Sequence, residues 1–231
     1  MTFDFINDLN LPNDNGPIYR ETLMGRFPVE PFNTCSNLIF LGIIVYFTIR
    51  VYNSPKQHSF LAFCLPILTI GFIGGTVFHG TRSHQIWLFM DWMPIMILCL
   101  SAVIYFILKL YKVWWKRILT ILIIFVVSFA IRRLPIPISV RISLGYMITA
   151  ITVLLPIVLY LIKTKGKHKE LIIVAFFCFV IAVGFRSADK LWETEVLYMG
   201  THWLWHVFGG ISVFFLMLYV YKDKLKKESI D

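Results

Sequence analysis

Hydrophobic residues fill seven blocks of the chain, separated by short polar connections. Most blocks approach the roughly 17–25 residues with which a helix crosses a bilayer. A segment in lipid must satisfy its own backbone hydrogen bonds, and a helix does so. We therefore expect an all-α, polytopic integral membrane protein with seven transmembrane helices. The blocks are Ser36–Tyr52, Phe60–His79, Ile86–Leu108, Ile118–Ile131, Val140–Ile162, Leu171–Phe185 and Trp203–Tyr221.

The lysines and arginines predict how these helices are oriented. If the N-terminus is outside or lumenal, the inner segments hold 14 of the 22 basic residues and 12 of the 13 lysines. Inner connections of membrane proteins carry such an excess, so the C-terminus is expected inside, in the cytosol. The connection between the fourth and fifth blocks fits this rule poorly, because it places Arg132, Arg133 and Arg141 outside.

One domain, residues 1–231, is expected, because no linker or repeat divides the blocks. Residues 1–34 would be an extramembrane segment and residues 222–231 a basic cytosolic tail. The orientation predicts a multi-pass protein of the inner membrane in a bacterium, or of the ER or Golgi membrane in a eukaryote.

Composition and charge exclude other classes. Hydrophobic residues make up 58% of the chain and charged residues 15%, and the mean hydropathy of +0.75 is too high for a soluble domain. The net charge of +9 is not gathered on an amphipathic helix, so we expect the lipid bilayer and no nucleic acid as partner. No protein partner is implied. The four cysteines lack CxxC spacing and are interpreted as free thiols.

A few ionisable side chains fall within or at the ends of these blocks, where each is costly and needs a reason. His79 ends the second block, Asp91 lies early in the third, and His202 and His206 open the seventh. Since successive helices run in opposite directions, all four come to the outer side of the membrane. This common depth predicts a metal site, whereas an isolated HxxxH pair would more often be two packed histidines.

The spacing of these residues indicates the chemistry. His202 and His206 are four residues apart, on one helical face, and can chelate one ion. With His79 they would supply three ligands and leave a fourth position for water, as in catalytic zinc sites. Zinc lowers the pKa of bound water and polarises a carbonyl. Asp91 would take the proton of that water and pass it to a leaving amine. The depth of the site favours a lipid amide or ester as substrate.

The same residues resemble those of the alkaline ceramidase family, within the CREST superfamily of seven-helix membrane hydrolases. The resemblance spans essentially the whole chain and is especially close to bacterial members. It rests on EPFNTCSNL from Glu30 to Leu38, Phe78–His79 with Asp91, FRSAD from Phe185 to Asp189, and GTHWLWH from Gly200 to His206. The family implies hydrolysis of the N-acyl bond of ceramide to a long-chain base and a fatty acid. It also implies Zn2+ on the three histidines and Asp91 as the group that activates water.

Two features depart from the family pattern at the catalytic residues. The family usually has a serine four residues before the first histidine, proposed to stabilise the oxyanion, and this chain has Gly75. Thr76, three residues before His79, lies on nearly the same helical face and is the candidate replacement. The interval from His79 to Asp91 is one residue longer than in eukaryotic members, which bears on the reach of Asp91.

A third departure concerns calcium. Eukaryotic members resemble one another in an acidic N-terminal calcium loop that includes a glutamate at the position of Glu30. The preceding stretch, GPIYRETLMGRFPVE from Gly16 to Glu30, offers only Glu21 and Glu30 here, whereas Ca2+ takes six to eight oxygen ligands. We expect Glu30 instead to support a ligand, pair with a basic residue or cap the first helix. Zn2+ is the expected cofactor, and Ca2+ is the less favoured one.

Three functions remain open on the sequence. The favoured one is a zinc-dependent intramembrane amidase that acts on ceramide or a related N-acyl lipid. The alternative is a non-catalytic receptor or lipid-binding protein with a structural metal. A transporter is the third, but a transport path would place ionisable groups through the thickness of the bilayer.

Overall fold

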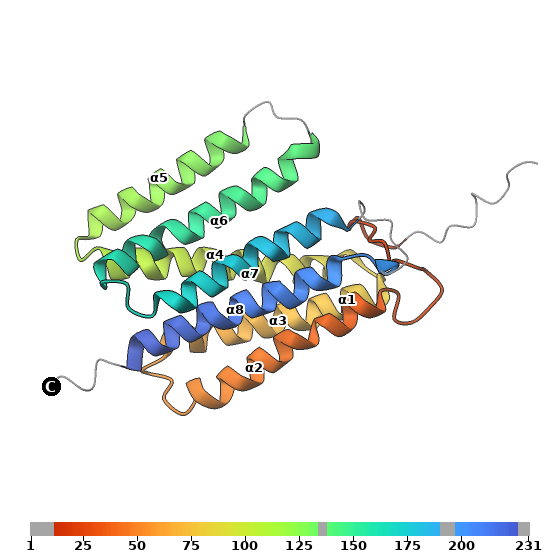
Figure 1. Cartoon of the computed structure of the whole chain (residues 1–231), viewed down its shortest axis with the longest axis horizontal. Helices are drawn as coiled ribbons and strands as arrows, with labels where there is room; N and C mark the ends of the chain where they lie inside the picture. The colour runs from red at the N-terminus through yellow and green to blue at the C-terminus, as the bar shows by residue number, and fades with distance from the viewer. Residues whose placement is uncertain (1–11, 134–137, 190–196, 226–231) are drawn as a thin grey trace, which may run out of the picture. The chain divides into compact units, whose positions relative to one another are not determined.

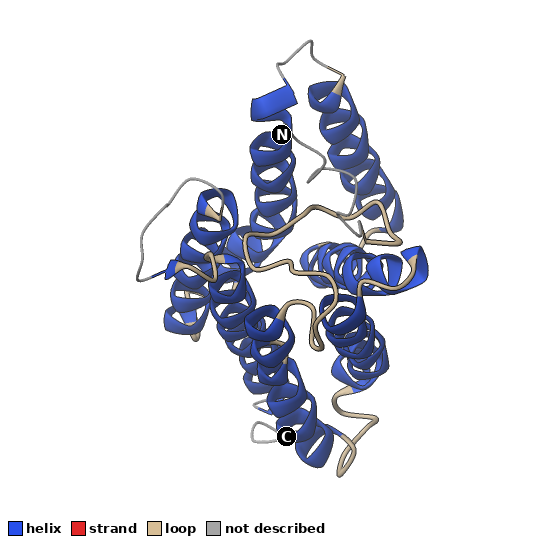
Figure 2. Ribbon diagram, turned by 90° about the vertical axis from the view of Figure 1, so that its right-hand side faces the viewer, coloured by secondary structure: helices blue, strands red, loops and turns tan. Residues whose placement is uncertain are grey.

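The computed structural model describes residues 12–133, 138–189 and 197–225, and within these ranges the chain forms helices and no strand (Figure 2). Asn37 alone separates the first two helices, which together form one span, Pro31–Val51. The helices are α1 (Pro31–Ser36), α2 (Leu38–Val51), α3 (Ser59–Thr81), α4 (Gln85–Leu110), α5 (Trp114–Arg132), α6 (Ile138–Lys163), α7 (Lys169–Ala188) and α8 (His202–Leu225).

Six spans are long and apolar enough to cross a membrane, and α6 adds a seventh, shorter apolar stretch at Ile148–Lys163. This confirms the expected all-α polytopic membrane protein with seven membrane helices. The two short sequence blocks correspond to α5, with 19 residues, and α7, with 20, because both helices extend into flanking residues. Basic side chains such as Lys116 and Lys169 can extend from such helix ends toward water. The orientation in the membrane stays a prediction.

The first helix begins at Pro31, inside the segment expected to be extramembrane up to residue 34. A proline at the first helical position fits, since its missing N–H would have no partner there. At the other end, α8 continues to Leu225, and the rest of the expected basic tail lies outside the described residues.

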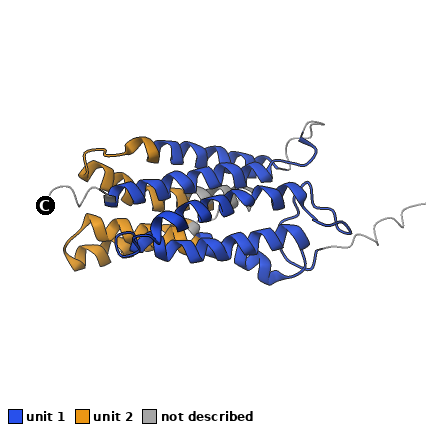
Figure 3. Cartoon of the chain, turned by 90° about the horizontal axis from the view of Figure 1, so that it is seen from below, with its two compact units in different colours: residues 1–95, 173–231 blue, residues 96–172 orange. Residues whose placement is uncertain are grey.

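Two compact units can be distinguished, residues 1–95 with 173–231 and residues 96–172 (Figure 3). In the first unit, α1 and α2 pack against α3 and α8, and these helices lie side by side in Figure 1. The Ser212 hydroxyl of α8 donates to the Ala175 carbonyl of α7 at 2.8 Å and joins these two helices. Aromatic and aliphatic side chains such as Phe47, Leu61 and Phe78 fill the core of this unit.

The second unit contains the hairpin of α5 and α6. The side chains of Ser128 and Thr152 hydrogen-bond across this hairpin at 3.2 Å. No residue of α5 between Trp114 and Ile131 is buried, although the helix is strongly apolar. Such a surface is stable in contact with lipid tails and not in contact with water.

The N-terminal segment, residues 12–30, crosses the end of α3 without forming a helix. The backbone N–H groups of Val29 and Glu30 donate to the carbonyls of Gly80 and His79, and Asn13 donates to Arg82. The last carbonyls of a helix have no partner within the helix, so these bonds satisfy them. The segment is thereby fixed to the end of α3 that carries His79.

Candidate metal centre

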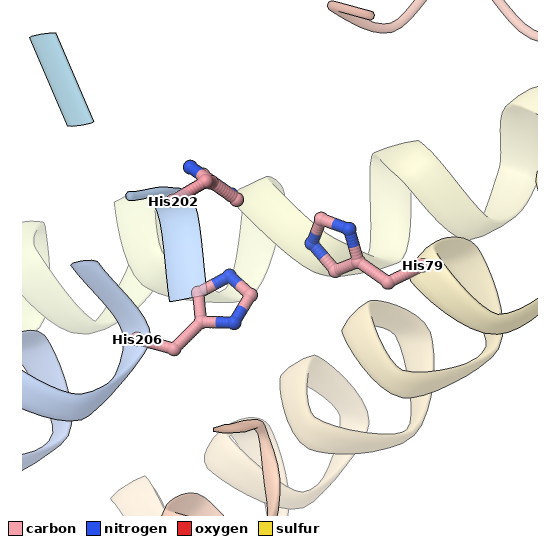
Figure 4. A group of neighbouring side chains, drawn as sticks. All are labelled: His79, His202 and His206. Carbon is pink, nitrogen blue, oxygen red and sulfur yellow. The ribbon is translucent and has the colours of Figure 1, made fainter. Parts of the chain in front are cut away.

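Three histidines from two helices meet in the first unit. His79 comes from the last turn of α3, and His202 and His206 come from the first two turns of α8. Their candidate ligand atoms all lie within 4.8 Å of one another, and the residues are 0%, 2% and 4% exposed. Figure 4 shows the three rings gathered around one space. The structure thus brings together all three predicted ligands.

Hydrogen bonds select the ligand nitrogen of two of these rings. His79 Nδ1 lies 2.5 Å from Glu30 Oε2, and His79 Nε2 is buried with no hydrogen-bond partner. His206 Nδ1 lies 3.1 Å from the Asn33 carbonyl oxygen and 2.8 Å from the Ser36 hydroxyl. A carbonyl can only accept, so Nδ1 of His206 carries the proton and Nε2 is left as its ligand atom. Metal-binding histidines are commonly oriented in this way.

Tyr19 of the N-terminal segment covers the third ring. Its ring stacks on His202 with centroids 3.8 Å apart and planes 20° apart. Burial raises the pKa of the Tyr19 hydroxyl above its usual value, so the ring adds no charge beside the histidines. His202 Nδ1 is buried and has no hydrogen-bond partner. Unsatisfied ring nitrogens in a tight group of three histidines fit the donor set of a zinc site.

Glu30 connects His79 to a buried ion network. Its Oε1 accepts from Arg82 and from the Thr22 hydroxyl, each at 2.6 Å. Arg82 also donates to both carboxylate oxygens of Asp14, at 2.9 and 2.7 Å. Burial alone would raise the pKa of Glu30, but its hydrogen bonds to His79 and Thr22 and the nearby charges outweigh burial and lower it. Glu30 is therefore an anion that can hold the His79 ring in one orientation.

The backbone of Arg82 adopts a left-handed conformation, with φ of 48°. A residue with a Cβ atom adopts this conformation only at a cost. The three acceptors of its guanidinium group, Asp14, Pro17 and Glu30, hold it there. The expectation that Glu30 pairs with a basic residue agrees with this contact.

Glu21 caps α1 from a distance along the chain. Its two carboxylate oxygens accept from the backbone N–H groups of Phe32 and Asn33, at 2.9 and 2.6 Å. These are among the N–H groups that a helix start leaves without a partner. The helix cap that we expected of Glu30 is supplied by Glu21, because Glu30 makes no side-chain cap bond.

Asp91 lies in the second turn of α4 and touches α3 at Gly75. A Cβ atom at Gly75 would stand 2.5 Å from Asp91 Oδ1, far closer than atoms can approach. Gly75 is one helical turn before His79, so the glycine makes room for the carboxylate close to the histidines. Asp91 is not a member of the group of three ligands. The Thr76 hydroxyl is buried and makes no hydrogen bond.

Asp189 organises the start of α8. Its Oδ1 accepts from the backbone N–H groups of Thr201 and His202, at 2.8 and 2.9 Å, and Oδ2 accepts from Arg20 N–H. Gly200, with φ of 75°, leaves room for this carboxylate. Asp189 thus sets where the HxxxH helix begins and joins it to the N-terminal segment.

Sequence reasoning missed the roles of several residues that support the histidines. The motif from Phe185 to Asp189 pointed to Asp189, and the motif from Glu30 included Asn33 and Ser36, but their partners could not be read from it. Asp14, Tyr19 and Arg82 lie outside the apolar blocks and follow no spacing rule. A single arginine directly after the HGT of α3 was the available signal for Arg82.

Comparison with known families agrees with this geometry. The family model described as Ceramidase matches residues 24–230, a range that contains all eight helices and the three histidines. No individual curated protein matches the chain. Family membership indicates a lipid amide hydrolase embedded in a membrane, as the resemblance of the motifs implied. On the extent of this match, the chain belongs to the ceramidase family.

Proposed function

We propose that this protein is a zinc-dependent intramembrane hydrolase that cleaves the N-acyl amide bond of ceramide or a related lipid. The observation that carries the proposal is the group of three buried, pre-oriented imidazoles with a carboxylate, Asp91, packed one turn away. Family membership supports the substrate class. The products would be a long-chain base and a fatty acid.

His79, His202 and His206 would hold the zinc ion. Bound zinc supplies a Lewis acid and a water molecule of lowered pKa at neutral pH. The chain supplies the orientation of the ligands through Glu30, Asn33 and Ser36. Loss of such a supporting contact typically lowers metal affinity or activity by about 10–100-fold.

Asp91 would act as general base and then as general acid. Its carboxylate accepts a proton from water as the water oxygen bonds to the amide carbonyl carbon. When the C–N bond breaks, Asp91 returns that proton to the leaving nitrogen, which departs as the amine of the long-chain base. The acyl group leaves as the fatty acid. One carboxylate serves both proton transfers, so the reaction consumes only water.

A location at the outer or lumenal face of the membrane is part of this proposal. It rests on the lysine distribution together with the position of the ligands at one end of α3 and α8. An amphiphile could keep its acyl chain in the bilayer while its amide reaches the histidines. The lipid is the only partner that the proposal requires.

The roles of Glu21 and Glu30 in the proposal are structural. Each carboxylate oxygen of both residues already accepts a hydrogen bond from the protein. The guanidinium group of Arg82 places a fixed positive charge between the carboxylates of Asp14 and Glu30. These carboxylates would otherwise attract an added cation most strongly. We therefore propose that activity does not need added Ca2+.

The test is to incubate the purified protein with a panel of N-acyl lipids and to identify the products by mass. Ceramide and matched acyl esters should be compared with and without a zinc chelator, and with and without Ca2+. We expect amide cleavage that the chelator abolishes and Zn2+ restores. A metal-loaded protein that binds these lipids and cleaves none of them would favour the non-catalytic receptor instead.

A further inference from the structure

Asn37 stands between α1 and α2 and is only 3% exposed. Its side-chain nitrogen, Nδ2, is buried and has no hydrogen-bond partner. A buried amide N–H group without a partner costs folding free energy, and the large majority of buried polar groups in folded proteins have a partner. The mechanism described above does not use this donor.

The Asn37 side chain reaches the same point of α3 as Asp91. A Cβ atom at Gly75 would lie 2.5 Å from Asp91 Oδ1, and 3.3 and 3.5 Å from Asn37 Nδ2 and Oδ1. The carboxamide and the carboxylate therefore both lie beside a glycine that is one turn before His79. Three elements, the α1–α2 junction, α3 and α4, meet at this point.

The junction between α1 and α2, which carries Asn37, also contacts His206. Ser36, the preceding residue, has its hydroxyl 2.8 Å from His206 Nδ1. The Asn33 carbonyl, one turn earlier, also contacts this ring. Asn37 is therefore held at a constant place with respect to both the histidines and Asp91, as a preorganised donor must be.

We propose that Asn37 is a further catalytic residue, whose Nδ2–H group donates a hydrogen bond to the oxygen of the scissile amide. This inference rests on the proposed function. As water bonds to the carbonyl carbon, the electron pair of the C=O bond moves onto that oxygen, and Asn37 stabilises the negative charge. The pair returns to re-form C=O as the C–N bond breaks. The proton stays with Asp91 during the first step and leaves with the amine in the second.

Thr76 offers a competing donor, because its hydroxyl is also buried without a partner. Asn37 is preferred because its side-chain nitrogen and the Asp91 carboxylate both lie beside Gly75. The proposed base and the proposed donor must act on the same carbonyl group, so they must lie close together. The Thr76 hydroxyl makes no hydrogen bond to Asp91 or to any other described residue. The two residues can be separated by comparing Thr76→Val with the Asn37 variants.

The experiment replaces Asn37 by leucine, which has a similar shape and no donor. A donor used only in the transition state should lower kcat by about 10²–10³-fold and leave KM nearly unchanged. Zinc content should be unchanged, and Tm should stay equal or rise, because a buried unsatisfied group is removed. Asn53→Leu, at an exposed position between α2 and α3, is the matched control and should keep its kcat.

A second readout does not depend on turnover. A long-chain phosphonate that imitates the tetrahedral intermediate should bind Asn37→Leu more weakly by the same factor as the loss in kcat/KM. The long-chain base product should bind equally well to both proteins. Asn37→Ser, which keeps a smaller donor, should regain part of the activity.

Several results would overturn the role of Asn37. Unchanged kcat/KM in Asn37→Leu, or the full loss in Thr76→Val alone, would assign the donor elsewhere. Loss of zinc and a lower Tm in both Asn37 variants would make the residue structural. These results leave the proposed hydrolase standing if the wild type cleaves N-acyl lipids. A wild type that cleaves none would overturn the hydrolase and the role of Asn37 together.

Discussion

At each end of α3 a buried histidine packs against α8, but the surroundings of the two histidines differ. His58, just before the helix, is 3% exposed and stacks on Tyr221, with ring centroids 4.2 Å apart and planes 16° apart. His79, about 30 Å along the helix, meets His202 and His206 at centroid distances of 5.4 and 4.9 Å. Burial next to an aromatic ring is common to both ends.

The two ends differ in the partners of the histidine ring nitrogens. His79 Nδ1 is taken by Glu30, and its other nitrogen faces two more imidazoles without a hydrogen bond. The ring that stacks on His58 in the described part of the chain is the phenol of Tyr221 and not an imidazole. A buried histidine therefore becomes a candidate ligand only when other ligands converge on it and a neighbouring group fixes its orientation.

The largest expected difference is between two single variants. One removes a ligand at the His79 end of α3, and the other replaces the stacked ring at the His58 end. His206→Ala should lose the zinc, about one ion per chain in the wild type, and all measurable turnover. His58→Phe should keep both, because phenylalanine can preserve the stack on Tyr221, and should change stability by less than about 1.5 kcal/mol. Metal analysis and lipid hydrolysis measure both variants. Equal zinc content in His206→Ala and wild type would remove the distinction between the two ends.

The next prediction separates metal binding from proton transfer at the end of α3 that carries His79. Asp91→Asn should keep the zinc, since Asp91 is not among the grouped ligands, and should lower kcat by about 10²–10⁴-fold, the usual contribution of a general acid–base. Metal content and kcat should be measured on the same preparation. Wild-type kcat in this variant would show that another group moves the proton.

A smaller loss is expected from filling the space that Asp91 occupies. Gly75→Ala would put a Cβ atom 2.5 Å from Asp91 Oδ1 and displace the carboxylate. We expect kcat to fall by about 10²-fold, as for a misplaced catalytic group. Gly209→Ala, where nothing lies within 4 Å, is the control and should keep its activity. Equal kcat values for the two variants would mean that the approach of Asp91 to α3 is not needed.

The smallest expected effect concerns the ion network behind His79. Arg82→Met removes the charge between Asp14 and Glu30 and should weaken zinc affinity by about 10–100-fold, as loss of a ligand-supporting contact does. Faster hydrogen exchange across residues 12–30 should accompany this change, because the segment loses its anchor. Arg50→Met, at an exposed position over Tyr46, provides the control. Chelator competition measures the affinity, and identical curves for both variants would contradict the role of Arg82.

The sequence predicted the fold and the gathering of the three histidines, because both follow from regular patterns. Long apolar blocks must become helices in lipid, and alternating helix direction brings His79 to the same end as His202 and His206. The burial of His58 follows from no such pattern. The residue lies between two apolar blocks, and its side chain is buried against Tyr221.

The supporting residues could not be predicted because they lie in irregular chain. Tyr19 and Asp14 belong to a segment whose path depends on hydrogen bonds to the end of α3 and to Asp189, and not on hydrophobic periodicity. Glu21 was considered as a calcium ligand, but its carboxylate caps α1. Predicting this cap requires knowing that the chain folds back over eleven to twelve residues. The contact between Gly75 and Asp91 depends on the close approach of two helices.

The position of Asp189 has a consequence for biosynthesis. Its carboxylate joins Arg20 to Thr201 and His202, which are synthesised much later than Arg20. Two of the three imidazoles belong to α8, which is made after the other described helices, so a nascent chain lacks the complete group of three candidate ligands until α8 has been inserted. An unfinished or misinserted chain would then retain no tightly bound metal, which gives the cell a chemical difference between finished and unfinished molecules.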